Sequence, residues 1–224
     1  MYELQQSETD VVMASANMSL GGGPEQGDAC GNTVLQAAVD QLRDAGTAVV
    51  AASGNNGFNA GISFPACVAG VVSVGAVDAR GSVDAVVWYS NTGPNLDLLA
   101  PGVGILSAYP PASPPYAWAG GTSMAAPHVA GAFAVARTLV GSTDPDVIEA
   151  ALESVGRPVT DSDNGLTFPR LHFGSNLSVS PTLSFQPANP ELGIRSPRAW
   201  GGATRVSSRR SQRPAPHSFH CAWS

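Results

Sequence analysis

The chain of 224 residues contains no lysine, and only 12% of its residues are charged. Residues 1–173 hold 16 of the 17 acidic residues and 5 of the 11 arginines, so this part is acidic and lacks the basic surface that nucleic-acid binding requires. Residues 174–224 hold six arginines and one acidic residue, without apolar periodicity. We therefore predict a folded domain at 1–174, a flexible basic Ser/Pro/Arg-rich tail at 175–224, and no nucleic-acid partner.

Long hydrophobic runs are also absent. The most apolar stretch, 124–136, contains Pro127 and His128 and is followed by Arg137, so it falls short of the roughly 18 uncharged residues of a membrane-spanning helix. The first ten residues, MYELQQSETD, are polar and acidic and do not resemble a signal peptide. We expect no membrane partner.

Cysteine is scarce, and its spacing excludes two classes of site. The three cysteines form no CxxC or CxxH pair, which argues against structural zinc. They permit one disulfide in the folded part, Cys30–Cys67, and leave Cys221 unpaired. The sequence also argues against a nucleotide-binding domain, because Gly21-Gly22-Gly23 lacks the GxGxxG pattern and no lysine is present to complete a phosphate loop.

The patterns that are present predict an α/β domain with a mostly parallel sheet. Apolar runs at 47–52 and 71–77 are typical of strands buried on both faces, and shorter strands are expected within 10–20, 96–102 and 164–173. The strand within 10–20 is expected to enter a turn at Gly21-Gly22-Gly23-Pro24. One helix is predicted from Asn32 or Thr33 to Gly46, and another begins at Asp144-Pro145 with a capping acid and a first-position proline. Strands alternating with helices indicate a parallel sheet.

The segment GTSMAAPHVAG places Ser123 at the head of an apolar helix, after Gly120 and Gly121. A serine acts as a nucleophile only with a base, a group that orients the base, and donors for the oxyanion. A helix N-terminus supplies free N–H groups and favours negative charge, and the glycines allow a substrate backbone to approach. Taken alone, a Gly-Thr-Ser sequence before a helix favours the interpretation of Ser123 as a helix cap.

This segment closely resembles the nucleophile segment of the subtilases, the subtilisin-like serine proteases of peptidase family S8. NMSLGGG at 17–23 resembles the edge of that family's substrate cleft, and VVAASGNNG at 49–57 resembles the segment that carries its oxyanion asparagine. The resemblance implies a three-layer α/β fold and a serine endopeptidase acting on proteins or peptides. In it Ser123 is the nucleophile and Asn55 the oxyanion donor.

The same resemblance implies a substrate groove. Ser19, Leu20 and Gly21 would pair with the peptide backbone as an added strand. Ala52, Ser53 and Gly54 would form one wall of the pocket for the side chain before the scissile bond, with Ser63 near its floor. This neutral pocket favours apolar or medium-sized side chains. Phe64-Pro65 in the adjacent turn is a candidate cis peptide.

Two catalytic motifs of the family are missing, because neither Asp-Thr-Gly nor Asp-Ser-Gly occurs and no His-Gly-Thr-His is present. His128 lies five residues after Ser123 and does not share its helix face, and nothing around His172, His217 or His220 indicates a base. We expect that the chain lacks the N-terminal part of its domain, with the triad Asp and His, and is inactive alone. The alternative is a non-catalytic pseudoprotease that binds peptides in the same groove.

No cofactor is required for this chemistry, and no metal site is predicted. Asp97 would contact a calcium ion in a full-length relative, but one acid at a strand end does not define a site; Asp10 and Asp78 are interpreted as surface or strand-end acids. The family resemblance and the possible Cys30–Cys67 bond together predict a secreted protein.

Overall fold

The central strands are apolar throughout, and their successive side chains point to opposite faces of the sheet, so the sheet is covered on both faces. The computed structural model describes residues 13–81, 84–109 and 115–173, all within a compact unit of 1–180. The predicted tail at 175–224 lies outside the described residues. Val50, Val72 and Val74 face one apolar cluster, whereas their neighbours Val49 and Val71 face another, as expected from the two-residue period of a strand.

Eleven strands and three helices are formed by the described residues. The strands are β1 (Ser15–Met18), β2 (Gly22–Gln26), β3 (Ala48–Ala52), β4 (Ile62–Phe64), β5 (Val71–Asp78), β6 (Ala85–Val86), β7 (Leu98–Pro101), β8 (Ile105–Ala108), β9 (Tyr116–Ala119), β10 (Arg157–Thr160) and β11 (Thr167–Arg170). The helices are α2 (Thr33–Asp44), α3 (Thr122–Val140) and α4 (Pro145–Val155).

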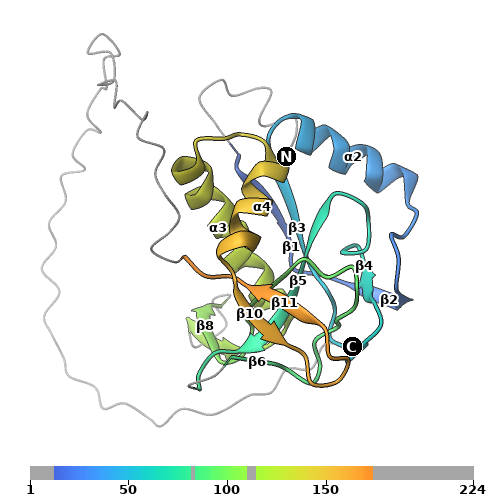
Figure 1. The fold of residues 1–224 in the computed structure, drawn as a ribbon, viewed down its shortest axis with the longest axis vertical. Coiled ribbons are helices and arrows are strands. Elements are labelled where there is room, and N and C mark those ends of the chain that lie inside the picture. Colours follow the sequence, from blue (N-terminus) through green and yellow to red (C-terminus); the bar gives the residue numbers. More distant parts are fainter. Residues whose placement is uncertain (1–12, 82–83, 110–114, 174–224) are drawn as a thin grey trace, which may run out of the picture. The chain divides into compact units, whose positions relative to one another are not determined.

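The central sheet has the strand order β1-β3-β5-β7-β11-β10, with β6 added to β5. Strands β1, β3, β5, β7 and β11 run parallel, and β6 and β10 pair antiparallel to their neighbours. Figure 1 shows α3 and α4 on one face of this sheet and α2 on the other. This arrangement confirms the predicted α/β class, the mostly parallel sheet and the three layers.

Both predicted helix starts are present with the expected caps. The Asn32 side chain accepts a hydrogen bond from the Leu35 N–H at the start of α2. The Asp144 side chain accepts one from the Asp146 N–H at the start of α4, with Pro145 at the first helical position. Short polar caps therefore mark these boundaries in sequence, as the physics of unpaired terminal amides requires.

The glycine-rich segment after β1 differs from its expected form. Gly21–Pro24 was expected as a turn, but Gly22–Gln26 forms the extended strand β2, which pairs antiparallel with β4. The backbone hydrogen bonds of this ribbon outweigh the local turn tendency of glycine and proline. The ribbon β8–β9 also has no counterpart among the predicted elements; it pairs Ile105 with Ala119 and Ala108 with Tyr116.

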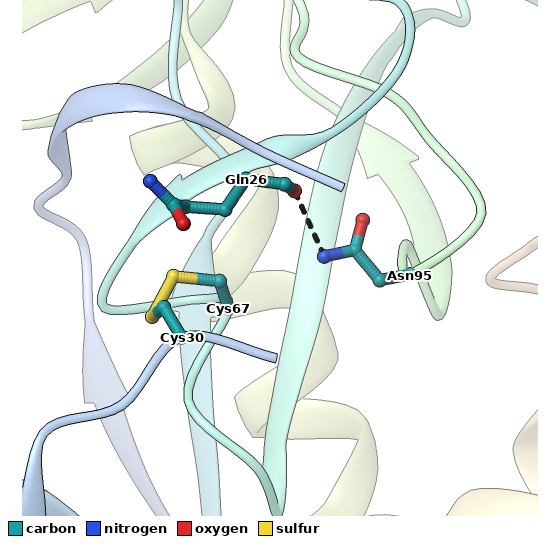
Figure 2. Close-up of a disulfide and its surroundings, with 4 residues drawn as sticks. All are labelled: Gln26, Cys30, Cys67 and Asn95. Atoms are coloured by element: carbon teal, nitrogen blue, oxygen red, sulfur yellow. Dashed lines mark hydrogen bonds between the residues drawn. A yellow bond between two sulfur atoms is a disulfide. The ribbon is translucent and has the colours of Figure 1, made fainter. Parts of the chain in front are cut away.

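The disulfide allowed by the cysteine positions is present. Cys30 and Cys67 are bonded with their Cα atoms 5.3 Å apart, and Figure 2 shows the bond beside Gln26, whose backbone oxygen accepts a hydrogen bond from Asn95 Nδ2 at 3.1 Å. The Phe64–Pro65 peptide is cis, as predicted. Among the described helices, none has the length and apolarity needed to cross a bilayer.

Candidate functional site

Ser123 is the second residue of α3, at a helix start that has no cap of its own. The N-cap residue is Gly121, which offers no side chain, and its backbone N–H donates to Gly102 O at 2.8 Å. The first backbone amides of a helix have no partner within the helix. The Met124 N–H donates to Gly121 O, so the amides before it need acceptors from outside the helix, next to a half-buried serine.

Asn55 supplies the missing cap from another part of the chain. Its Oδ1 accepts hydrogen bonds from the Thr122 N–H at 2.9 Å and from the Thr122 hydroxyl at 3.0 Å. The Thr122 hydroxyl in turn accepts from the Gly54 N–H at 3.2 Å. Among the described residues, Asn55 Nδ2 has no hydrogen-bond partner. The Asn55 side chain is thus held by its oxygen, with its N–H groups free beside the start of α3.

Residues 19–21, which follow β1, lie next to the start of α3. The Ser19 hydroxyl donates to Ser123 O at 2.7 Å and accepts from Asn17 Nδ2 at 2.9 Å. A Cβ placed on Gly21 would lie 3.3 Å from Ala52 O and 3.4 Å from Phe64 O, so this glycine permits a close approach of three backbone segments. Leu20 is 58% exposed. The structure therefore brings Ser19–Gly21, the end of β3 and the nucleophile segment together.

The predicted wall and floor residues are buried and joined by hydrogen bonds. Ser53 and Ser63 are both 0% exposed, and the Ser63 N–H donates to Ser53 O at 2.8 Å. Between them lies Asn91, also 0% exposed, which donates from Nδ2 to Ser63 Oγ at 2.9 Å. Sequence reasoning missed Asn91, because Ser90-Asn91-Thr92-Gly93 has the composition of an ordinary loop.

No histidine of the described residues contacts Ser123. The Nδ1 atom of His128 lies 2.8 Å from Met124 O, one turn earlier on its own helix. His172 follows β11, and His217 and His220 lie outside the described residues. The Ser123 hydroxyl has no hydrogen-bond partner within the described parts of the chain, so no base for it is found there.

The surroundings of Ser123 are neutral. None of the groove and pocket residues named above carries a charge. The nearby Tyr89 hydroxyl donates to Gly102 O at 2.9 Å and would lie 3.4 Å from a Cβ on Gly120. Burial raises the pKa of Tyr89 above 10.0, with a further contribution from Asp78, so this hydroxyl keeps its proton at neutral pH.

A separate carboxylate cluster is formed by Asp97, the residue before β7, and two residues of α4. Single carboxylate oxygens of Asp97, Glu149 and Glu153 all lie within 4.8 Å of one another. Burial, and next the charge of Asp97, raises the pKa of Glu149 to about 8. Burial also raises the pKa of Asp97, against the lowering effect of hydrogen bonds from the Ser73 N–H and hydroxyl. Grouped carboxylates of this kind do not by themselves define a metal site.

A cavity of about 660 Å³ lies elsewhere, between the end of α2 and the start of α4. Its lining includes Arg43 and Asp146, which form an ion pair with each other. It contains none of the residues predicted for the groove or the nucleophile segment. This cavity is therefore separate from the predicted site of Ser123 and Asn55.

Comparison with known proteins gives one family and a consistent set of relatives. The sequence pattern of the subtilase family matches residues 2–168. Subtilisin DY of Bacillus licheniformis is 38% identical over 160 residues, and an extracellular protease of Xanthomonas campestris pv. campestris is 38% identical over 155 residues. A solved protease of Pseudoalteromonas arctica has a TM-score of 0.59 and 36% identity.

The matched regions cover much more of this chain than of its relatives. They include 70% of this chain but 53% of Subtilisin DY, and 66% of this chain but 25% of the Xanthomonas protease. For the Pseudoalteromonas structure the shares are 70% and 49%. The chain thus spans from a quarter to about half of the length of these proteins.

Proposed function

Since the chain belongs to the subtilase family, we propose that it supplies the nucleophile and the oxyanion donor of a serine endopeptidase. The observation that carries this proposal is the hydrogen bonding of Asn55. Its oxygen is held by Thr122, the residue immediately before Ser123, while its N–H groups have no partner among the described residues. An amide held in this way is ready to stabilise an oxyanion formed at Ser123.

The reaction would be acyl transfer. The Ser123 oxygen attacks the carbonyl carbon of the scissile peptide, and its proton passes to a histidine base. The carbonyl oxygen becomes an oxyanion that accepts hydrogen bonds from Asn55 Nδ2 and from the Ser123 N–H at the start of α3. The base returns the proton to the leaving amine, and water then hydrolyses the ester by the same steps. These roles need no cofactor.

The base and the acid that orients it are supplied by residues that this sequence does not contain. Neither the Asp-Thr-Gly nor the His-Gly-Thr-His motif of the family is present, and His128 is engaged with Met124 O. The 224-residue chain alone is therefore proposed to be inactive or nearly so. A peptide-binding pseudoprotease is the alternative, since the groove residues are also present.

The proposed substrates are proteins or peptides that lie along Ser19–Gly21 as an added strand. The neutral, buried floor at Ser63 favours an apolar or medium-sized side chain before the scissile bond. Secretion is part of the proposal as well. The Cys30–Cys67 bond is favoured in an oxidising compartment, and one relative is named an extracellular protease.

The test is labelling of Ser123 by a fluorophosphonate in the full chain at pH values from 7 to 10. The labelled residue and the extent of labelling are measured by peptide mass spectrometry. Without a histidine base, attack requires the serine alkoxide, so the rate should rise about tenfold per pH unit without a plateau. Ser123→Ala should abolish the label, and peptide hydrolysis should not exceed that of Ser123→Ala.

Other outcomes would overturn separate parts of the proposal. A label that reaches a plateau above pH 7, or hydrolysis that depends on Ser123, would disprove the inactivity of the chain alone. A label that avoids Ser123, together with micromolar binding of peptides to the groove, would favour the pseudoprotease instead.

A further inference from the structure

Asn91 occupies a central position among the residues of the proposed site, although it lies more than 30 residues from Asn55 and Ser123 in sequence. Its side chain is fully buried. Its Oδ1 accepts from the Asn56 N–H at 2.8 Å and from the Phe58 N–H at 3.1 Å. Its Nδ2 donates to Ser63 Oγ at 2.9 Å, to Ser53 O at 3.1 Å and, at a longer 3.4 Å, to Asn56 Oδ1.

The backbone of Asn91 contacts the same segment. Its N–H donates to Gly54 O at 3.0 Å, and its carbonyl oxygen accepts from the Ser53 hydroxyl at 2.8 Å. Gly54 and Asn56 are the two chain neighbours of Asn55. Asn91 therefore holds the backbone on both sides of Asn55, while Thr122 holds the Asn55 side chain.

This arrangement has a physical reason in the exposure of the loop. Asn55, Asn56 and Gly57 are exposed, and an exposed loop without anchors would sample many positions of the Asn55 amide. Oxyanion stabilisation depends on donors that are already in place before charge develops. A buried amide with all of its donors and acceptors used is a rigid anchor for such a donor.

From these contacts we propose that Asn91 is a positioning residue for the oxyanion donor Asn55, and that it fixes the Ser63 floor of the pocket through the same side chain. This inference rests on the function proposed above. It assigns no contact with substrate to Asn91: the residue acts through Asn55 on one side and through Ser63 on the other.

The experiment measures phosphonylation of Ser123 in the full chain at pH 9 for Asn55→Ala, Asn91→Ala and the double variant. In this step the Ser123 oxygen forms a bond to phosphorus, fluoride leaves, and the serine proton goes to hydroxide. The developing phosphoryl oxyanion occupies the place of the peptide oxyanion. A displacement of about 1 Å in a site can cost up to 10²-fold in rate, so Asn91→Ala should slow labelling at least about tenfold.

The double variant separates positioning from a general loss of structure. If Asn91 acts through Asn55, the double variant should label at the rate of Asn55→Ala, because the second change has nothing left to displace. Asn95→Ala is the matched control: Asn95 donates to Gln26 O at 3.1 Å beside the disulfide (Figure 2). Within the described residues, its side chain has no hydrogen bond to Asn55. Ser123 of the Asn95→Ala variant should be labelled at a rate within about twofold of that in the unchanged chain, even where the thermal stability of the variant is lowered.

Each failure has a distinct meaning. Equal labelling of Asn91→Ala and the unchanged chain, with Asn55→Ala slow, would overturn the positioning role and leave the proposed function intact. Equal labelling of Asn55→Ala and the unchanged chain would instead remove the oxyanion role from the proposed function. Should Asn91→Ala not fold, Asn91→Ser is used with NMR of the Asn55 side-chain amide; resonances unchanged from the parent chain would equally refute the inference.

Discussion

Two polar clusters inside the same apolar domain are built from opposite chemistry. The cluster around Asn91 contains only neutral groups, namely the amides of Asn91 and Asn55 and the hydroxyls of Ser53, Ser63 and Thr122. The cluster of Asp97, Glu149 and Glu153 brings three acids together between β7 and α4. In the first, the Asn91 side chain places its donors against acceptors and its acceptor against donors, whereas the second places like charges side by side.

The difference has a consequence for how each cluster responds to its surroundings. Hydrogen bonds between neutral groups do not change with pH while the protein is folded. The cluster around Asn91 therefore keeps its side chains in fixed positions at every pH. Clustered carboxylates share protons instead, and their contribution to stability changes with pH. The comparison predicts that substitutions in the first cluster act at every pH, and that substitutions in the second act increasingly as the pH rises from about 4.5 to about 8.

The largest effect is expected for Gly54→Ala. A Cβ at Gly54 would lie 2.2 Å from Asn91 Nδ2 and 2.8 Å from Ser63 Oγ, and its φ of +110° is a conformation that side chains disfavour. Overpacking and backbone strain together should lower the free energy of unfolding by about 3 kcal/mol at any pH, measured by urea unfolding. Gly131→Ala is the control, because it has open space on the exposed side of α3 and should stabilise by about 0.5–1 kcal/mol.

Thr122→Val should have an intermediate effect. It keeps the shape of the side chain but removes the hydroxyl that accepts from the buried Gly54 N–H and donates to Asn55 Oδ1. An unsatisfied buried donor costs about 1–3 kcal/mol, and we expect about 2 kcal/mol in urea unfolding. Thr138→Val, on the exposed side of the same helix, should change stability by less than about 0.5 kcal/mol. Equal effects at the two positions would contradict the importance of the Thr122 hydroxyl.

The smallest effect is expected for Glu149→Gln, and it depends on pH. The pKa of Glu149 is raised in the folded state from 4.5 to about 8, so between these values the folded chain keeps a proton that the unfolded chain loses. Stability from this group is therefore fully present below pH 4.5 and is lost as pH rises through about 8. Glu149→Gln should raise the melting temperature by a few degrees at pH 9, about 1 kcal/mol, and change it little at pH 4.5.

The role of the neighbouring charge can be tested separately. Asp97→Asn removes the charge of Asp97, which is the second cause of the raised pKa of Glu149 after burial, so the pH at which stability declines should move down. An unchanged midpoint would mean that the charge of Asp97 does not contribute to the raised pKa of Glu149. Measurement of the melting temperature from pH 5 to 9 distinguishes the two.

Local chemistry made much of the fold predictable. Asn32 and Asp144 mark helix starts because a short polar side chain is needed where backbone amides lack partners. The runs at 47–52 and 71–77 contain β3 and most of β5, because buried parallel strands are apolar on both faces. The Cys30–Cys67 bond was one allowed pairing, and the structure contains it.

The missed features depend on contacts between distant segments. Asn91 has the local sequence of a loop residue, and its importance arises only when Gly54, Asn56 and Ser63 are folded around it. Glu149 and Glu153 lie on one face of α4, but their proximity to Asp97, the residue before β7, arises only when these distant segments are folded together. Strand β2 was missed because pairing with β4 outweighs the preference of glycine and proline for turns. The catalytic roles of Ser123 and Asn55 stay predictions.

The crowding at Gly54 also limits how the proposed substrate pocket can be redesigned. A mutagenesis library that varies Gly54 would return mostly misfolded clones, because no larger residue fits between Asn91 and Ser63. Changes in substrate preference would have to be sought by varying Asn91 and Ser63 as a coupled pair, with Gly54 left unaltered. Laboratory selection should therefore enrich variants that change both Asn91 and Ser63 over variants that change only one of them.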